Sequence, residues 1–66
     1  MKVNGESIPA SEGLTVSKLL EQKGYQVNRI AVEVNRDIVP KAQYDTYALH
    51  EDDVIEIVCF MGGRFQ

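Results

Sequence analysis

Hydrophobic and polar residues alternate over two short stretches near the start of the sequence. Residues 1–3 and residues 6–8 each alternate in character, as expected for β-strands. Asn4-Gly5 lies between the two stretches. This dipeptide is the strongest short-range signal for a β-hairpin, because both turn residues tolerate positive φ. Pro9 cannot donate a hydrogen bond to a neighbouring strand, so it either ends the pairing or places this strand at an edge of the sheet. Residues 1–8 are therefore predicted to form a short β-hairpin.

The apolar residues that follow have helical spacing. Val16, Leu19 and Leu20 lie at positions i, i+3 and i+4, so they occupy one face of an α-helix. Thr15 precedes them and can accept a hydrogen bond from a free backbone N–H of the first turn. Gly24 lies where the left-handed residue that ends a helix is expected. The predicted helix is too short to be stable alone in water, so it must pack against a sheet.

The second half of the sequence again has the pattern of strands. Ile30 to Val34 alternates, with one charged residue on its outward face. Residues 35–37 form a predicted turn, residues 38–39 a short return strand, and Pro40 ends that strand. Val54 to Phe60 is the longest stretch of strand-forming residues and is predicted to be the central strand.

This order of elements predicts an α+β fold with a β-grasp, or ubiquitin-like, topology. A mixed sheet of four to five strands would pack on one short helix. A right-handed crossover would place the last strand parallel to the first, in the middle of the sheet. The 66 residues have room for one core, so the predicted organisation is a β-grasp domain at 1–61 and a flexible C-terminal tail at 62–66.

Composition excludes several classes of protein. The single cysteine cannot form an internal disulfide, and no apolar stretch approaches the roughly 20 residues of a membrane span. We therefore expect a cytoplasmic protein without a membrane partner. The net charge is −3 and the basic residues are scattered, which argues against nucleic acid. The acidic run Glu51-Asp52-Asp53 is predicted to be a solvated turn, with electrostatic steering toward a basic protein partner as the alternative.

The sequence contains no convincing catalytic or metal-binding group. His50 is the only histidine and has no metal-ligand spacing around it, so a surface position next to a turn is expected. Cys59 shares its strand face with Ile55 and Ile57, which predicts a small buried side chain. A reactive thiol would need a cationic neighbour or a helix N-terminus, and the sequence offers neither. No catalytic residue and no metal ligand are predicted.

The same alternation predicts an outward-facing apolar group at the end of the last strand. Val58 and Phe60 point away from the core, and Met61 follows them. A partner-binding surface is one interpretation, since such groups are unusual on small acidic monomers. Coverage by the loop around Tyr44 and Tyr47 is the alternative.

Gly62-Gly63 is either a turn or an extended tail. Only three residues follow it, and they cannot build another strand. Glycine has no Cβ, so a tail of this kind can enter a narrow channel in any backbone conformation. From Cys59, four residues reach at most about 14 Å beyond the domain. That length would place a carboxylate at Gly63 inside the active site of another protein.

These residues resemble the ThiS/MoaD family of ubiquitin-like sulfur carriers over nearly the whole chain. The similar segments are the hairpin with N-G, then L-T-V-S-K-L-L, then A-V-E-V-N-R-D-I-V-P, and finally D-V-I-E-I-V leading into F-M-G-G. The combination V-N-x-x-I-V-P with D-x-I-E-I-V and G-G is specific, whereas Gly-Gly alone is weak. The length is more similar to the thiamine carriers of this family than to its molybdopterin members.

The resemblance implies a carrier that is not itself an enzyme. A ThiF-like adenylyltransferase would use ATP-Mg to adenylate the carboxylate of Gly63, and a sulfur-relay cysteine desulfurase would supply sulfur to form a thiocarboxylate. A ThiG-like thiazole synthase would then take the sulfur for thiamine biosynthesis. The domain itself would bind no cofactor. In similar proteins the outer face of the last strand contacts the partners, which favours Val58, Phe60 and Met61 as binding residues.

The residues Arg64-Phe65-Gln66 depart from the family pattern, in which the chain ends at the glycine. A Gly63 in a peptide bond has no carboxylate to adenylate, so we expect a processing peptidase to remove residues 64–66. One alternative is a sulfur carrier for another pathway, such as cysteine, methionine or molybdopterin synthesis. The other is a ubiquitin-like interaction module that is never activated.

Overall fold

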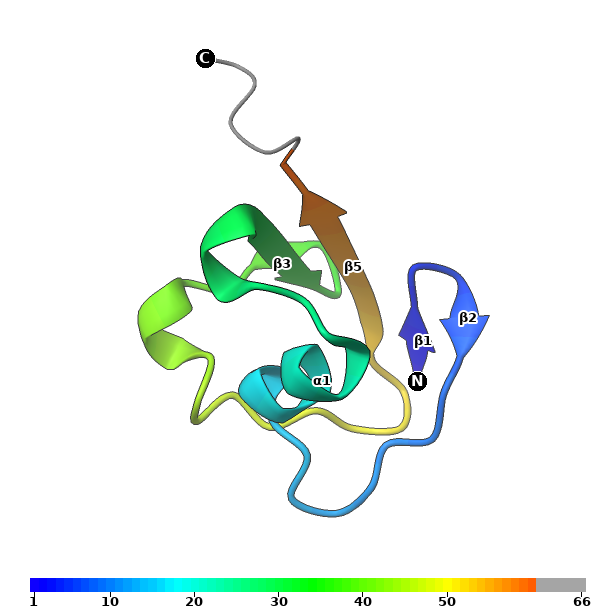
Figure 1. The fold of residues 1–66 in the computed structure, drawn as a ribbon. Coiled ribbons are helices and arrows are strands. Elements are labelled where there is room, and N and C mark those ends of the chain that lie inside the picture. Colours follow the sequence, from blue (N-terminus) through cyan, green and yellow to red (C-terminus); the bar gives the residue numbers. More distant parts are fainter. Residues whose placement is uncertain (61–66) are drawn as a thin grey trace.

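A computed structural model describes residues 1–60, which fold into a mixed sheet with one α-helix on one face (Figure 1). The strands are β1 (Lys2–Val3), β2 (Glu6–Ser7), β3 (Ile30–Val34), β4 (Asp37–Ile38) and β5 (Val54–Cys59). The helix is α1 (Val16–Lys23), and two 3-10 turns are η1 (Val27–Arg29) and η2 (Lys41–Gln43). No helix in this part of the chain has the length and apolar character needed to cross a bilayer.

The last strand lies at the centre of the five-stranded sheet, whose order is β2-β1-β5-β3-β4. β5 pairs in parallel with β1 and antiparallel with β3. The predicted α+β, β-grasp arrangement is therefore confirmed, including the parallel pairing of the first and last strands.

Each flanking pair of strands is joined by a two-residue turn with asparagine at its first position. Asn4 and Gly5 have φ of 52° and 85°, and Asn35 and Arg36 have φ of 52° and 75°. Type I′ turns require positive φ at both positions, and asparagine tolerates it better than most residues. The hairpin predicted at Asn4-Gly5 is confirmed. The second turn is shorter than the predicted residues 35–37, because Asp37 already belongs to β4.

The side chains of both turn asparagines bind the backbone of β5. Asn4 Oδ1 accepts a hydrogen bond from the Ile57 N–H at 2.7 Å, and Asn4 Nδ2 donates to the Ile57 carbonyl at 3.3 Å. On the other edge, Asn35 Oδ1 accepts from the Val54 N–H at 2.9 Å. Asn4 thus continues the pairing of β5 beyond the end of the two-residue β1. The two hairpins hold β5 through side chains as well as through strand pairing.

The helix has the predicted caps. Thr15 Oγ1 accepts a hydrogen bond from the Lys18 N–H at 3.3 Å, and Gly24 ends the helix with a φ of 78°. Val16, Leu19 and Leu20 are buried against the sheet. The apolar face of the helix and one face of the sheet therefore form the two layers of a single core.

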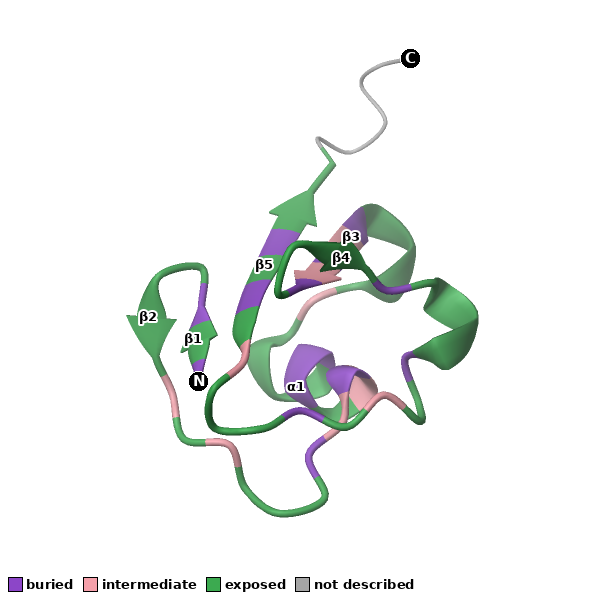
Figure 2. Cartoon of the chain, turned by 180° about the vertical axis from the view of Figure 1, so that it is seen from behind, coloured by how far each residue is buried: buried purple, intermediate pink, exposed green. Residues whose placement is uncertain are grey.

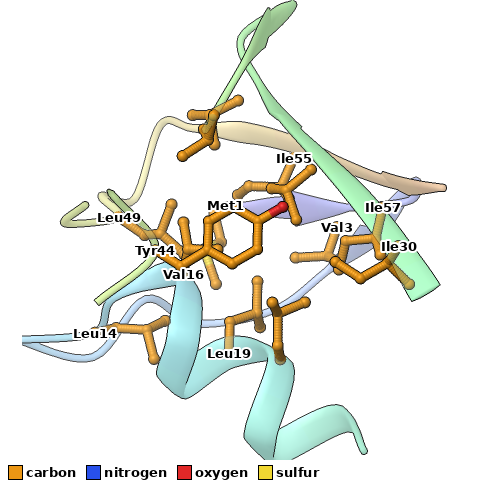
Figure 3. Packing of buried hydrophobic residues seen from close by; sticks show 14 residues of the cluster. Met1, Val3, Leu14, Val16, Leu19, Ile30, Tyr44, Leu49, Ile55 and Ile57 are labelled. Carbon is orange, nitrogen blue, oxygen red and sulfur yellow. The ribbon is translucent and has the colours of Figure 1, made fainter. Parts of the chain in front are cut away.

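The core combines side chains from both layers and from the long connection before β5 (Figure 3). Its strand residues alternate with residues of intermediate burial in β3 and with exposed residues in β5, which gives the banded colouring of both strands in Figure 2. Tyr44 and Leu49 of the connection are also buried. Burial raises the pKa of Tyr44, with a smaller opposing effect from a backbone hydrogen bond to Val32.

Removing the Asn4 side chain is expected to destabilise the domain. Asn4→Gly keeps a residue suited to positive φ but leaves the Ile57 N–H and carbonyl without their partner, at a cost of about 1–3 kcal/mol. Asn4→Ala should cost more, because alanine is also strained at positive φ. Urea unfolding of both variants measures these losses. An Asn4→Gly variant as stable as the parent chain would contradict the role given to the side-chain bonds.

Candidate functional site

The candidate site is the outer face of β5 and the end of that strand. Ile55 and Ile57 are buried beneath the helix, whereas Val54, Glu56 and Val58 are exposed on the opposite face. The Phe60 N–H donates to the Arg29 carbonyl at 2.8 Å, which continues the pairing with the β3 side one residue beyond the strand. The backbone is thus held in an extended direction up to the last described residue.

Val58 and Phe60 are both exposed, as the alternation predicted. Their exposed fractions are 50% and 47%, so the loop around Tyr44 and Tyr47 does not cover them. Tyr44 is instead buried in the core, and Tyr47 packs against that core. That Val58 and Phe60 bind a partner stays a prediction. Met61, the two tail glycines Gly62 and Gly63, and residues 64–66 lie outside the described residues.

The prediction that Cys59 is buried was wrong, because this side chain is exposed. Its register partner Ile30 is 1% exposed, so the adjacent strand position is covered. Figure 1 shows the reason: the C-terminal end of β5 projects away from α1. Alternation gives the face on which a side chain lies, but not how far the layer that covers this face extends.

The turn predicted at Glu51-Asp52-Asp53 is confirmed, with His50 exposed beside it as expected, and Asp53 organises this turn. Asp53 Oδ2 accepts a hydrogen bond from the His50 N–H at 2.8 Å, and its Oδ1 accepts from Asn35 Nδ2 at 2.9 Å. His50 Nδ1 lies 3.6 Å from Asp53 Oδ2 on a side chain that is 74% exposed. Within residues 1–60 no three His, Cys, Asp or Glu side chains are close enough to hold a metal ion.

Sequence reasoning missed how far the exposed apolar face extends. Ile38 on β4 is 71% exposed and Val54 is 48% exposed, on the same side of the sheet as Val58. Two glutamates lie on the same face as these apolar residues, and Glu33 of β3 is directly opposite Glu56 of β5. The strand register creates this pair. The alternation within each strand gave the face of each glutamate, but not the residue across from it.

The outer face is hollowed beside the two glutamates. A hollow of about 450 Å³ is lined by Val54 and by the polar residues Glu33, Asn35, Arg36 and Glu56. None of the ion pairs within residues 1–60 involves Glu33 or Glu56. The face therefore combines exposed apolar groups with two carboxylates that have no ion-pair partner among the described residues.

These features define the class of the protein as a small ubiquitin-like β-grasp domain with its last strand leading out of the fold. Known proteins of this kind match it closely. The crystal structure of the thiamine biosynthesis protein ThiS from Geobacter metallireducens superposes on this chain with a TM-score of 0.75 and is 31% identical in sequence. The aligned region covers 94% of each chain. The sulfur carrier protein ThiS of Bacillus subtilis is 33% identical over 64 residues, which is 96% of this chain and 97% of that protein.

The sequence model of the ThiS family matches residues 1–63. The chain therefore belongs to the ThiS family, and the relatives that it matches over nearly their whole length include two proteins named sulfur carrier protein ThiS. It also resembles a thiazole synthase of Paramagnetospirillum magneticum, at 43% identity over 61 residues. That match covers 92% of this chain but only 19% of the length of the synthase.

The exposed position of Cys59 is expected to make its thiol accessible in the folded protein. Reaction with a chromogenic disulfide reagent should be complete under native conditions, without the lag that a buried thiol shows. Cys59→Ser should change the free energy of unfolding by no more than about 0.5 kcal/mol, as is usual for a surface position. A thiol that reacts only after denaturant is added would place Cys59 back in the core.

Proposed function

We propose that Gly63 is the reactive end of this sulfur carrier and that its carboxylate becomes a thiocarboxylate used to form the thiazole of thiamine. The main support is that the match to the ThiS family ends at Gly63. A second support is β5, whose pairing holds the backbone extended up to Phe60, three residues before this glycine. The function thus belongs to the end of the chain, and the folded domain presents it.

The chemistry requires activation by a partner. A carboxylate is a poor electrophile, so an oxygen of Gly63 attacks the α-phosphorus of ATP, with Mg²⁺ bound, and pyrophosphate leaves. The persulfide of a cysteine desulfurase relay then displaces AMP from the carbonyl carbon and forms an acyl disulfide. A thiol, acting as the two-electron reductant, cleaves the S–S bond and leaves the terminal sulfur on the Gly63 carbonyl. The resulting thiocarboxylate is a good nucleophile that remains attached to its carrier. A ThiF-like adenylyltransferase would supply the first step, so ATP-Mg is a cofactor of that partner and not of this domain.

Gly63 must first be freed from Arg64. Hydrolysis of the Gly63–Arg64 peptide bond adds one water, leaving a carboxylate on Gly63 and an amine on Arg64. A peptidase that cleaves after the second glycine is therefore part of the proposal. The absence of a side chain on Gly62 and Gly63 suits an extended backbone in the narrow site of such a peptidase or of the adenylating enzyme.

The proposed acceptor of the sulfur is a ThiG-like thiazole synthase. The similarity of this chain to 19% of the length of two thiazole synthases, at 43% and 41% identity, supports a carrier domain and a synthase acting together. This observation favours thiamine over cysteine, methionine or molybdopterin as the pathway served.

A chain ending at Gly63 is expected to be adenylated by the ThiF-like enzyme of the same organism. ATP–pyrophosphate exchange measures this step. A chain ending at Gly62 should not support exchange above background, because its carboxylate lies one residue, or about 3.5 Å, too near the domain. The 66-residue chain should also be inactive until it is cleaved. Equal exchange with all three forms, or none with the Gly63 form, would refute the proposal.

The apolar end of β5 is expected to contribute to this reaction through docking. Val58→Ser should lower kcat/KM for adenylation about 10-fold, the effect of losing roughly 1.4 kcal/mol at an interface. Val27→Ser is the matched control, since Val27 is 42% exposed on η1 and lines a hollow with Leu20 and Glu21 of the helix instead of the outer face of β5. If both substitutions lower kcat/KM equally, Val58 has no special part in docking.

A further inference from the structure

The outer face of the sheet presents two carboxylates within an apolar surface. Glu33 and Glu56 lie directly opposite each other on the adjacent strands β3 and β5. Ala31 and Val58 form the next pair on the same face toward the end of β5. Ile38, which is opposite Glu33 on β4, is 71% exposed. Any macromolecule that covers these apolar side chains also covers the two glutamates.

The arrangement is unfavourable for the isolated domain. Like charges directly opposite each other on neighbouring strands destabilise a sheet. Of the basic groups nearby, Arg36 lines the same hollow, and Lys2 is opposite Val54 on β1. Neither of these groups forms an ion pair with the glutamates in the described structure. The fold itself therefore gives no reason for two negative charges at this place.

Covering the face would be costly without a counter-charge. A carboxylate removed from water without an ion-pair partner loses far more free energy than the neighbouring apolar groups gain. A binding partner must therefore bring a cation to this position. Arginine suits it best, because its planar guanidinium donates several hydrogen bonds in a fixed geometry and can bind two carboxylates at once.

We infer that Glu33 and Glu56 form the charged centre of a docking surface and receive an arginine or lysine side chain of the adenylating enzyme. The inference rests on the proposed function, because that enzyme must hold the domain while the tail enters its active site. The surface is continuous with the end of β5 through Val58 and Phe60, which are half exposed. The net charge of −3 also favours approach to a basic surface.

Other occupants fit less well. A second copy of this chain, paired symmetrically through the same face, would bring four carboxylates together. A metal ion would lack ligands, since no third His, Cys, Asp or Glu side chain joins the pair within residues 1–60. Nucleic acid would be repelled by the negative charge. A protein surface with a basic residue surrounded by apolar groups remains.

The test compares two variants that remove the same charge from different faces. Glu33→Gln/Glu56→Gln neutralises the docking surface. Glu12→Gln/Glu21→Gln neutralises two exposed glutamates, one before and one within the helix, that form no ion pair in the described residues. Calorimetry would measure the Kd of each for the ThiF-like enzyme of the host, using both the 66-residue chain and the form ending at Gly63.

The first variant is expected to bind at least about 10-fold more weakly, with a smaller dependence of Kd on salt. The control should stay within about 2-fold of the parent chain. Because repulsion is removed, the first variant should melt at the same temperature or higher. The single variants should each lose most of the affinity, since both carboxylates contact one cation.

Several results would overturn the inference. If Glu33→Gln/Glu56→Gln binds the enzyme as tightly as the parent chain, the two glutamates do not contact a cation of the enzyme. If both double variants bind equally weakly, the loss reflects only the lower net charge of the domain. A lower melting temperature of Glu33→Gln/Glu56→Gln would show that the two glutamates stabilise the fold itself. A parent chain that dimerises through this face in sedimentation experiments would make the partner a second copy. If the form ending at Gly63, with both glutamates intact, is neither bound nor adenylated, the proposed function itself fails, and this inference fails with it.

Discussion

The fold depends on how its central strand is held. β5 is the last strand of residues 1–60. It nevertheless lies between β1 and β3, which both precede it in the sequence. β1 is only two residues long, so strand pairing alone holds a small part of that edge. The Asn4 amide compensates by bonding both the N–H and the carbonyl of Ile57. Asn35 contributes a similar bond to Val54 from the opposite hairpin. Each asparagine thus serves its turn and the central strand at once.

Because β5 is held on both edges, its two faces can have different roles. The inner face provides Ile55 and Ile57 to a core shared with the helix. No other element of residues 1–60 covers the outer face of β5, where Val54, Glu56 and Val58 are exposed. A small domain buries a modest fraction of its surface. Leaving one whole sheet face open is therefore a considerable loss of possible burial, and it is consistent with a surface that a partner covers.

A carrier of this kind needs geometry more than catalytic side chains. The described residues contain no buried polar or charged side chain and no cluster of metal ligands. What the domain offers is a rigid strand that continues in an extended direction past its own sheet through the bond from Phe60 to Arg29. The chemical work in the proposed function belongs to the partners.

The sequence by itself determined the features that depend on neighbours in the chain. The Asn4-Gly5 turn, the caps at Thr15 and Gly24, and the inner and outer positions of β5 follow from local backbone preference and from side-chain periodicity. The ThiS resemblance was also visible in short motifs. Tertiary structure decided the rest. Cys59 is exposed because the helix does not extend over the end of β5, and alternation carries no information on that length. The pairing of Glu33 with Glu56, and the bonds from Asn4 to Ile57, join residues far apart in the sequence. Their contact depends on the register between strands, which no local pattern specifies.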